Sequence, residues 1–519
     1  MQYPAKFNLP DDFDLKGFIG ELADRYLIKK ELSRTNTITI HDTFDWRLFN
    51  KALVLYQFCD KLCLRKLSRS EIIHSVKVTS PPVYVWDFPE SKLKENLTSI
   101  IWPRALLMLV HLQSRSIPYS LLDREGKTVV SLAYEEIRSS PGKNAPVIVN
   151  HLWLQPVKGY DKHARKILQR FRNAGLTLNT EDDIYFKGLE SADKKPGSYS
   201  SKVKIQLEPN MRSDDATKII LRFLLQIIRT NEVNIEKDLD TEIIHDFRVA
   251  VRRTRSALAQ IQHVFSSRTT NRFKKDFAFI GKLTNELRDL DVYLLKEDSY
   301  KEKLTPLLSG GIDPLFDYFR EKRSKAFEKV IRGLKSKKYE KILNDWETFL
   351  NEPQHSSSTA SNAELPVIDL ASKGIHKKYR RVVKAGNSIL EKSDDRKLHI
   401  LRIHCKKLRY LMEFFSSLFP GEIMDVLIGQ LKKLQDNLGD FNDLHVQEEY
   451  LMAIADELPL TQKQIKKELM AIGGLVGILA RERDIVKDAF AKTFTEFASA
   501  ANKDLFQKLF ISQGKHRVK

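Results

Sequence analysis

A pattern of basic residues occurs twice in this chain. In each copy a histidine is followed, after three, seven and ten residues, by an arginine or a lysine. The first copy, here called the first stripe, is His245, Arg248, Arg252 and Arg255, and the second stripe is His399, Arg402, Lys406 and Arg409. At about 100° per residue, positions with this spacing fall within about 80° of one helix face. Each segment therefore predicts a helix that presents imidazole, guanidinium and ammonium donors, and such donors bind anions.

Further features of the two copies also repeat. A second base adjoins each stripe, Arg253 in one copy and Lys407 in the other. A single basic stripe is usually a solvated helix face, and like charges one turn apart cost a few tenths of a kcal/mol per pair. A repeat of this length instead indicates two copies of one supersecondary unit. We therefore interpret the stripes as an anion-binding feature that both units keep.

Acidic and amide residues follow each stripe. "LRDLD" follows the first and includes Arg288 and Asp289, and "LGDFND" follows the second and includes Asp440, Asn442 and Asp443. A pair of carboxylates could act in catalysis. We instead expect these side chains to pair with the stripe cations or to cap helices, and so to hold the cations in place.

The opposite sides of the two stripe helices are apolar, which predicts that those sides face a core. The expected core residues are Phe247, Ala250, Ala257 and Leu258 in the first copy and Leu401, Leu408, Met412 and Phe415 in the second. Helical periodicity extends from Pro209 nearly to the end of the chain. A Ser-rich stretch, residues 351–366, interrupts it and is expected to be a flexible connector.

The residues before Pro209 have a mixed α and β texture. Alternation and β-branched residues predict strands at residues 35–43, 51–58, 128–137, 145–157 and 202–209. Helices are expected at residues 15–31 and 162–174. We therefore expect an α+β domain over residues 1–205, followed by an all-α domain over residues 210–510.

Composition agrees with a basic, intracellular protein. The 519 residues carry a net charge of +19, which predicts attraction to polyanions or to acidic surfaces. The three cysteines, Cys59, Cys63 and Cys405, do not suggest a disulfide framework and suit a reducing compartment. We find neither a signal-peptide pattern nor a run of about 18 apolar residues. The expectation is a soluble cytoplasmic protein without a membrane partner.

The two basic segments together resemble a known family. "HDFRVAVRRTRSAL" with "ELRDLDV", and "LHILRIHCKKLRYLMEFF" with "LQDNLGDFND", are similar to the CHAD domain, the conserved-histidine α-helical domain. The resemblance covers roughly residues 210–510. It implies two pseudo-symmetric four-helix bundles, roughly residues 210–350 and 367–510, whose basic stripes face a shared central groove. It also implies the ligand, inorganic polyphosphate.

The predicted polyphosphate site combines the stripes with neighbouring side chains. Besides the two stripes it includes Arg253, Lys407, Arg288, Lys378, Arg381 and Tyr410. Polyphosphate offers only anionic oxygens, which suit bidentate guanidinium groups and point-charge ammonium groups, and His245 and His399 can also donate when protonated. A groove for single-stranded nucleic acid would interleave aromatic residues with the cations, and only Tyr410 lies on a basic face. RNA is therefore the less favoured ligand.

The first 205 residues resemble another family. "TITIHDTFDWRLFNKALVLY", "SIPYSLLDREGKTVVSLAYEEI" and "VNHLWLQPVKGYDKHARKILQRF" are similar to parts of the CYTH domain, the triphosphate-tunnel β-barrel. In active members a Glu-x-Glu-x-Lys motif supplies metal ligands and a phosphate contact. Here the best register is Gln2-Tyr3-Pro4-Ala5-Lys6, which keeps only the lysine. Because Mg²⁺ or Mn²⁺ needs hard oxygen ligands, the resemblance implies a catalytically weakened barrel.

Other charged residues of this region do not restore a metal site. Glu135 and Glu136 are neighbours on a predicted strand and so point to opposite faces, and we expect a surface pair at the strand end. Phosphate could still contact barrel or loop cations, which are individually expected to be solvated. These cations are Lys6, Arg47, Arg104 and Arg115.

The sequence thus predicts a polyphosphate-binding protein, associated in the cytoplasm with polyphosphate granules. We expect no catalytic residue, no metal ligand and no cofactor. Two alternatives stay open. One is a metal-dependent triphosphatase or polyphosphatase that acts through the N-terminal barrel, and the other, less favoured, is an RNA-binding scaffold.

Overall fold

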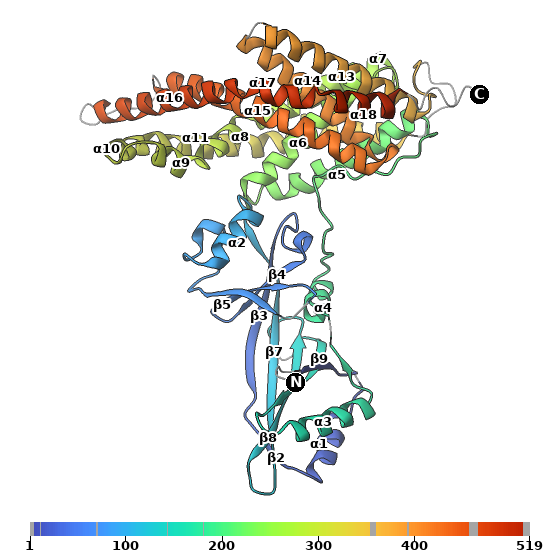
Figure 1. Cartoon of the computed structure of the whole chain (residues 1–519), viewed down its shortest axis with the longest axis vertical. Helices are drawn as coiled ribbons and strands as arrows, with labels where there is room; N and C mark the ends of the chain where they lie inside the picture. The colour runs from blue at the N-terminus through green and yellow to red at the C-terminus, as the bar shows by residue number, and fades with distance from the viewer. Residues whose placement is uncertain are drawn as a thin grey trace. The chain divides into compact units, whose positions relative to one another are not determined.

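The computed structural model describes residues 5–10, 12–68, 71–142, 144–179, 181–352, 360–391, 394–455 and 465–511. The chain divides into two units, residues 1–200 and residues 201–519, shown in Figure 1. Gln2 and Pro4, on which the expectation of a weakened metal site depends, lie outside the described residues.

The first unit is built on a ten-stranded sheet in which the described pairings are antiparallel. Its strands are β1 (Ala5–Asn8), β2 (Leu27–Lys30), β3 (Arg34–Thr43), β4 (Leu53–Phe58), β5 (Lys61–Lys66), β6 (Ile72–Lys77), β7 (Leu106–Leu122), β8 (Thr128–Arg138), β9 (Val147–Pro156) and β10 (Thr177–Leu178). The order is β10-β1-β9-β8-β7-β3-β4-β5-β6, and β2 also pairs with β7. The closed barrel implied by the CYTH resemblance stays a prediction.

Two apolar clusters hold helices against this sheet. Helices α1 (Leu15–Ala23) and α3 (Asp161–Asn173) pack on β1, β8 and β9 through residues such as Phe171 and Leu152. Helix α2 (Lys92–Ile101) packs on β4 and β5 through Leu97 and its neighbours. A further helix, α4 (Asp183–Ser191), contacts β9 and β7. The long strands β3 and β7 connect the regions of the two clusters (Figure 1).

Two expectations for secondary structure were wrong. The helix predicted over residues 15–31 ends at Ala23, and Leu27–Lys30 instead form β2, because they pair with the distant strand β7. Residues 202–209 form no strand. There the backbone N–H of Leu207 donates to the hydroxyl of Ser417, which ties this segment to the helical unit.

The second unit is helical. Its first half contains α5 (Ser213–Ile235), α6 (Thr241–Gln260), α7 (Ser267–Leu283), α8 (Asn285–Leu294), α9 (Glu297–Lys303), α10 (Pro306–Ser309), α11 (Asp313–Leu334) and α12 (Lys337–Asn351). Its second half contains α13 (Val367–Glu391), α14 (Asp395–Phe414), α15 (Gly421–Ala455), α16 (Ile465–Asp488), α17 (Phe490–Phe497) and α18 (Ala500–Phe510). Helix α6 packs against α5 and α7, α14 packs against α13 and α15, and α6 contacts α14. The pseudo-two-fold relation between two bundles stays a prediction.

Helices α6 and α14 begin alike and bury the expected sides. Asp240 caps α6 by accepting from the N–H groups of Glu242 and Ile243, and Asp394 caps α14 by accepting from that of Arg396. Each cap lies five residues before the stripe histidine, so it fixes where the helix and its stripe begin. All eight expected core residues are buried, each at most 3% exposed. The expected core sides are therefore confirmed.

The Ser-rich stretch between the halves is described only in part, because residues 353–359 lie outside the described residues. Its later residues contact the start of α5. The hydroxyl of Ser213 donates to the carbonyl of Leu365 at 2.7 Å, and the N–H of Asp214 donates to that of Ala363 at 3.1 Å. The beginning of the first half is thus fastened to the segment that leads into the second half.

Candidate functional site

The first stripe lies on α6, where polar groups of the next helices hold its leading arginine. The guanidinium of Arg248 donates to Asn285 Oδ1 at 2.7 Å and to Thr284 Oγ1 at 3.2 Å. Burial lowers the pKa of Arg248. Arg288 folds back to the start of α6 and donates to the carbonyl of Thr241 at 3.2 Å. His245 is half-buried on the same helix.

The second stripe lies on α14 and contacts α15. A hydrogen bond of 2.7 Å joins Nδ1 of His399 to Oδ1 of Asn442, and Arg402 donates to Asp443 at 3.0 Å. Lys406 is half-buried and forms no ion pair with a described residue. Burial lowers the pKa of Lys406 to about 8, and the charges of Arg402 and Arg252 contribute.

The two stripes meet where α6 contacts α14. Nε of Arg252, on α6, donates to the hydroxyl of Tyr410, on α14, at 2.8 Å. The charge of Arg252 also lowers the pKa of Arg402, although burial of Arg402 is the larger cause. Cations from both copies therefore act on one another electrostatically, and a single anion near Arg252 and Lys406 would be attracted by both copies.

A carboxylate on α14 contacts one cation from each copy. Glu413 accepts from Arg253 at 2.7 Å and pairs with Nε of Arg409 at 3.3 Å. Arg253 also donates to the carbonyl of Ser201, and its side chain is only 11% exposed. Arg253 is thus committed to contacts within the protein, whereas Arg252 and Arg255 are exposed and have no carboxylate partner among the described residues.

A second basic group lies between α13 and α14. Burial lowers the pKa of Lys378, on α13, and the charges of Arg381 and Lys407 lower it further. The same three cations contribute to the lowered pKa of His404, on α14, although burial of His404 is the largest cause. Of the predicted site residues, Lys378, Arg381 and Lys407 therefore form a group of their own beside the second stripe.

The predicted supporting acids have different surroundings. Burial raises the pKa of Asp289, although the nearby charges of Arg248 and Arg288 oppose the shift. Asp443 pairs with Arg402, as described above. Partial burial of the carboxyl group and the charges of Asp443 and Asp436 raise the pKa of Asp440, and the charge of Lys296 opposes the shift. Asp289 and Asp443 thus neighbour stripe cations, whereas Asp440 lies next to a cation outside the stripes.

Several contributors were not among the predicted site residues. Glu413 was missed although it stands four residues after Arg409, a spacing that brings side chains together on a helix. The repeated caps Asp240 and Asp394 were missed as well, although both stand five residues before a stripe histidine. Asn285 could not be found from spacing, because its contact with Arg248 depends on how α6 and α8 pack.

The N-terminal unit contains a polar cluster of its own. Lys6 is buried and its ammonium group lies 3.1 Å from Asp183, which also lies 2.7 Å from Nε2 of His151. Glu135 accepts from Ser114 and from Trp153, each at 2.7 Å. The expectation of a surface pair is therefore wrong for Glu135, because neighbouring strands supply donors that the local sequence does not reveal.

Two of the other cations named for this unit also differ from the expectation of solvated side chains. Arg104 is 1% exposed and pairs with Asp45 at 3.3 Å. Arg47 pairs with the same carboxylate at 3.0 Å and donates to two carbonyls of residues 101–102. Arg115 is exposed, as expected. Of the four cations named for this unit, only the side chain of Arg115 is solvated as expected.

In the described part of the chain, no group of three or more His, Cys, Asp or Glu side chains is arranged to hold a metal ion. Within the same residues, no helix has both the length and the apolar character needed to cross a membrane.

Sequence comparison relates part of this chain to other proteins. Uncharacterized protein MT2285 of Mycobacterium tuberculosis (strain CDC 1551 / Oshkosh) is 24% identical over 213 residues, which cover 41% of this chain and 40% of that protein. Uncharacterized protein Rv2226 of strain ATCC 25618 / H37Rv matches to the same extent. The chain thus spans about 40% of the length of these curated relatives.

Two solved structures are also similar. The crystal structure of the CHAD domain from the plant Ricinus communis matches 57% of this chain and 96% of its own, with 22% identity and a TM-score of 0.48. PptA from Streptomyces chartreusis matches 55% of this chain and 100% of its own, with 14% identity and a TM-score of 0.44.

The family model of the CHAD domain matches residues 219–452. The match includes both stripes, both Asp caps and the contact between Arg252 and Tyr410. Residues 219–452 of this chain are therefore a CHAD domain.

Proposed function

We propose that the helical unit binds inorganic polyphosphate through the cations of α6 and α14, and that this binding attaches the protein to polyphosphate granules in the cytoplasm. The CHAD family is associated with polyphosphate binding, which supports the ligand. The observation that carries the proposal is the hydrogen bond from Arg252, in the first copy, to Tyr410, in the second, which places Arg252 where its charge acts on Arg402 and Lys406.

The charges at this meeting point favour an external anion. Arg252 and Lys406 have no carboxylate partner among the residues that the structure describes, and the pKa of Lys406 is lowered to about 8 by burial and by the neighbouring arginines. Crowded cations of this kind are unfavourable in the free protein. A chain of phosphates would relieve the repulsion and would accept hydrogen bonds from the guanidinium groups.

The burial of the Tyr410 ring favours polyphosphate over RNA as the ligand. Its ring is 3% exposed and its hydroxyl accepts from Arg252, so it offers no free face on which a base could stack. Proteins that bind single-stranded nucleic acid without sequence preference combine a basic groove with exposed aromatic rings on which the bases stack. Tyr410 would instead fix the orientation of the Arg252 guanidinium.

For the N-terminal unit we propose a CYTH-like fold that is not an active metal-dependent triphosphatase. Lys6 and Asp183 already pair with each other, and Glu135 already accepts two hydrogen bonds. These contacts would have to break before the same side chains could hold a metal ion or a phosphate. No separate substrate is proposed for this unit.

The direct test is a binding titration with long-chain polyphosphate, tripolyphosphate and single-stranded RNA at several salt concentrations. Binding of polyphosphate should weaken as salt rises, because neutralised phosphates release condensed cations, as they do in nucleic acids. The double variant Arg252→Glu with Lys406→Glu should nearly abolish binding while helical circular dichroism persists.

A matched control reverses the same number of positive charges on another helix, α12. Lys337 and Lys341 on α12 are exposed and form no ion pair with a described residue. The double variant Lys337→Glu with Lys341→Glu should bind nearly as well as the unaltered protein. An equal loss in both double variants would mean that binding is diffuse attraction to a basic protein, and the proposed site would be wrong.

A further inference from the structure

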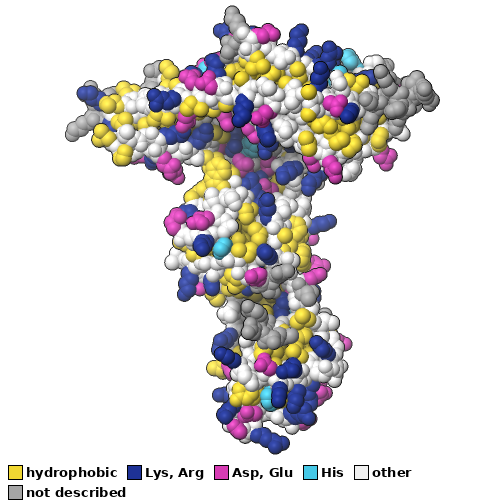
Figure 2. Space-filling model, viewed as in Figure 1, with side chains coloured by type: hydrophobic (Ala, Val, Ile, Leu, Met, Phe, Trp, Pro, Cys, Tyr) yellow, Lys and Arg dark blue, Asp and Glu magenta, His cyan; other side chains and the backbone are white. Residues whose placement is uncertain are grey.

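Helix α13 exposes cations around most of its circumference. Its core side consists of residues such as Ile375, Tyr379 and Val382, which recur at helical spacing and are buried. The remaining positions carry a run of bases: Lys373, His376, Lys377, Lys378, Arg380, Arg381 and Lys384. Lys378 and Arg381 lie at the edge next to α14, and His376 and Arg380 lie at the opposite edge, next to α18. Figure 2 shows Lys and Arg side chains gathered over this part of the helical unit.

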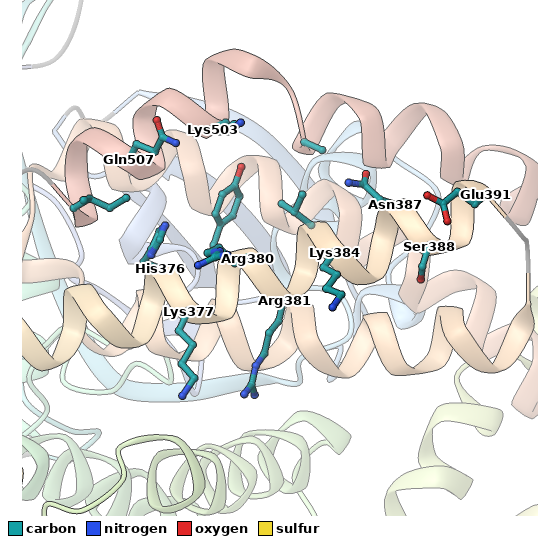
Figure 3. A pocket seen from close by; sticks show the side chains of 14 residues that line it. His376, Lys377, Arg380, Arg381, Lys384, Asn387, Ser388, Glu391, Lys503 and Gln507 are labelled. Atoms are coloured by element: carbon teal, nitrogen blue, oxygen red, sulfur yellow. The ribbon is translucent and has the colours of Figure 1, made fainter.

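The edge next to α18 borders a pocket of about 1120 Å³. We call it the α13 pocket and define it by its basic lining: His376, Lys377, Arg380, Arg381, Lys384 and Lys503. Lys503 and Gln507 face α13 from α18, whereas Lys377 and Arg381 project from the other side of α13 (Figure 3). Asn387, Ser388 and Gln507 add neutral donors, and Glu391 is the one carboxylate in the lining.

The basic residues of the α13 pocket are not balanced by acids. None of the six forms an ion pair within the part of the chain that the structure describes. Elsewhere in the unit, cations are commonly neutralised, as Arg323 is by Asp238 and Asp291. An unneutralised group of this size attracts anions and raises their local concentration.

Close packing fixes the walls of the pocket. The ring of Tyr379 stacks on that of Phe506, with centroids 3.8 Å apart. Gly386 lets α17 approach α13, because a Cβ at this position would overlap the ring of Phe494. Core contacts thus hold the backbones of α13 and α18, which carry the cations.

The spacing of the cations suits an extended anion rather than a single phosphate. His376, Arg380 and Lys384 recur at four-residue steps, so they form a row about 12 Å long at 1.5 Å of rise per residue. The exposed side of α13 continues this row through Arg381 to Lys378, which lies near Lys407 of α14. Lys407 adjoins Lys406 of the second stripe in the sequence, and basic residues continue from there through Lys378 and Arg381 to the α13 pocket.

We propose that the α13 pocket is a second binding segment for long phosphate chains, which reach it from the second stripe by way of Lys407, Lys378 and Arg381. This inference rests on the proposed function, because it assumes that the stripes hold the first part of the chain. Tripolyphosphate would occupy the stripes alone, whereas a long chain would occupy both segments. The pocket would thus give the protein its preference for chain length.

The experiment compares the variant Arg380→Glu with Lys503→Glu, the control Lys337→Glu with Lys341→Glu, and the unaltered protein. Each is titrated with tripolyphosphate and with long-chain polyphosphate at several salt concentrations. For the pocket variant, affinity for the long chain should fall at least about tenfold and its salt dependence should decrease by about two released cations. Its affinity for tripolyphosphate should not change, nor should the behaviour of the control.

Other outcomes would overturn the inference in distinguishable ways. An unchanged affinity of the pocket variant for long chains would refute the pocket and leave the stripe site standing. Equal losses for both ligands, or a larger loss for single-stranded RNA, would assign the pocket another role. Absence of polyphosphate binding by the unaltered protein would refute the proposed function itself. The neutral variant Arg380→Gln with Lys503→Gln should show a smaller loss of affinity in the same direction. It serves as the control for a loss that is caused by misfolding of the charge-reversed variant.

Discussion

At pH 8 about half of the Lys406 side chains in the free protein should be uncharged, because burial and the charges of Arg402 and Arg252 lower its pKa to about 8. A bound phosphate chain would restore the charge and return the pKa toward the ordinary value of about 10.4. Binding at pH 8 should therefore take up about 0.5 proton at this residue, since the bound form is fully charged. Above pH 8 the affinity should fall, and between pH 7 and pH 9 it should fall by about tenfold, with no further dependence from this group below pH 7.

Titration calorimetry with long-chain polyphosphate measures both effects. Proton uptake is obtained by repeating each titration in two buffers of different ionisation enthalpy at pH 7, 8 and 9. The matched variant is Lys406→Arg, whose guanidinium stays charged over this range. The variant should lose the uptake at pH 8 and should bind with nearly the same affinity at pH 7 and pH 9. Equal uptake by the variant and the unaltered protein would refute the assignment, because the proton would then belong to another group.

Three further predictions follow from contacts described above. Arg252→Lys should weaken polyphosphate binding roughly tenfold in titrations, because the charge remains but the hydrogen bond to Tyr410 and the bidentate fork are lost; unchanged affinity would contradict a geometric role. Gly386→Ala should lower the free energy of unfolding by about 1–3 kcal/mol in urea titrations, because the added methyl group overlaps Phe494; an unchanged midpoint would show that α17 can shift at little cost. Purified protein should hydrolyse little tripolyphosphate with Mg²⁺ or Mn²⁺ in a phosphate-release assay, because Lys6 is already paired; rapid turnover that mutation of the N-terminal unit abolishes would overturn this expectation.

Periodicity predicted the helical unit well because its signals are local. The alternation of core and basic positions along α6 and α14 is a property of each segment alone, and residues such as Phe247 and Leu401 are buried where the pattern places them. The cross-helix contacts could not be predicted in the same way. Arg252 and Tyr410 are separated by 158 positions, and only the packing of α6 on α14 brings them together.

The N-terminal unit shows the limits of local signals more clearly. Residues 27–30 continue an apparently helical segment, yet pairing with β7 makes them a strand. Lys6 and Asp183 are separated by 177 positions, and their ion pair depends on how β1 and α4 are placed around the sheet. Polar side chains of this kind look like solvated surface residues in the sequence, because nothing nearby in the chain reveals their partners.

The contact between α6 and α14 has a consequence for how this domain could be divided or inherited. Tyr410 and Glu413 come from the second copy, yet they hold Arg252 and Arg253 of the first. Either copy expressed alone would lack the contact between Arg252 and Tyr410 and the contact between Arg253 and Glu413. Separate fragments should therefore regain the arrangement only by reassociating. A substitution on one helix should accordingly be compensated most readily by a change on the other, so that the two copies evolve as a single unit.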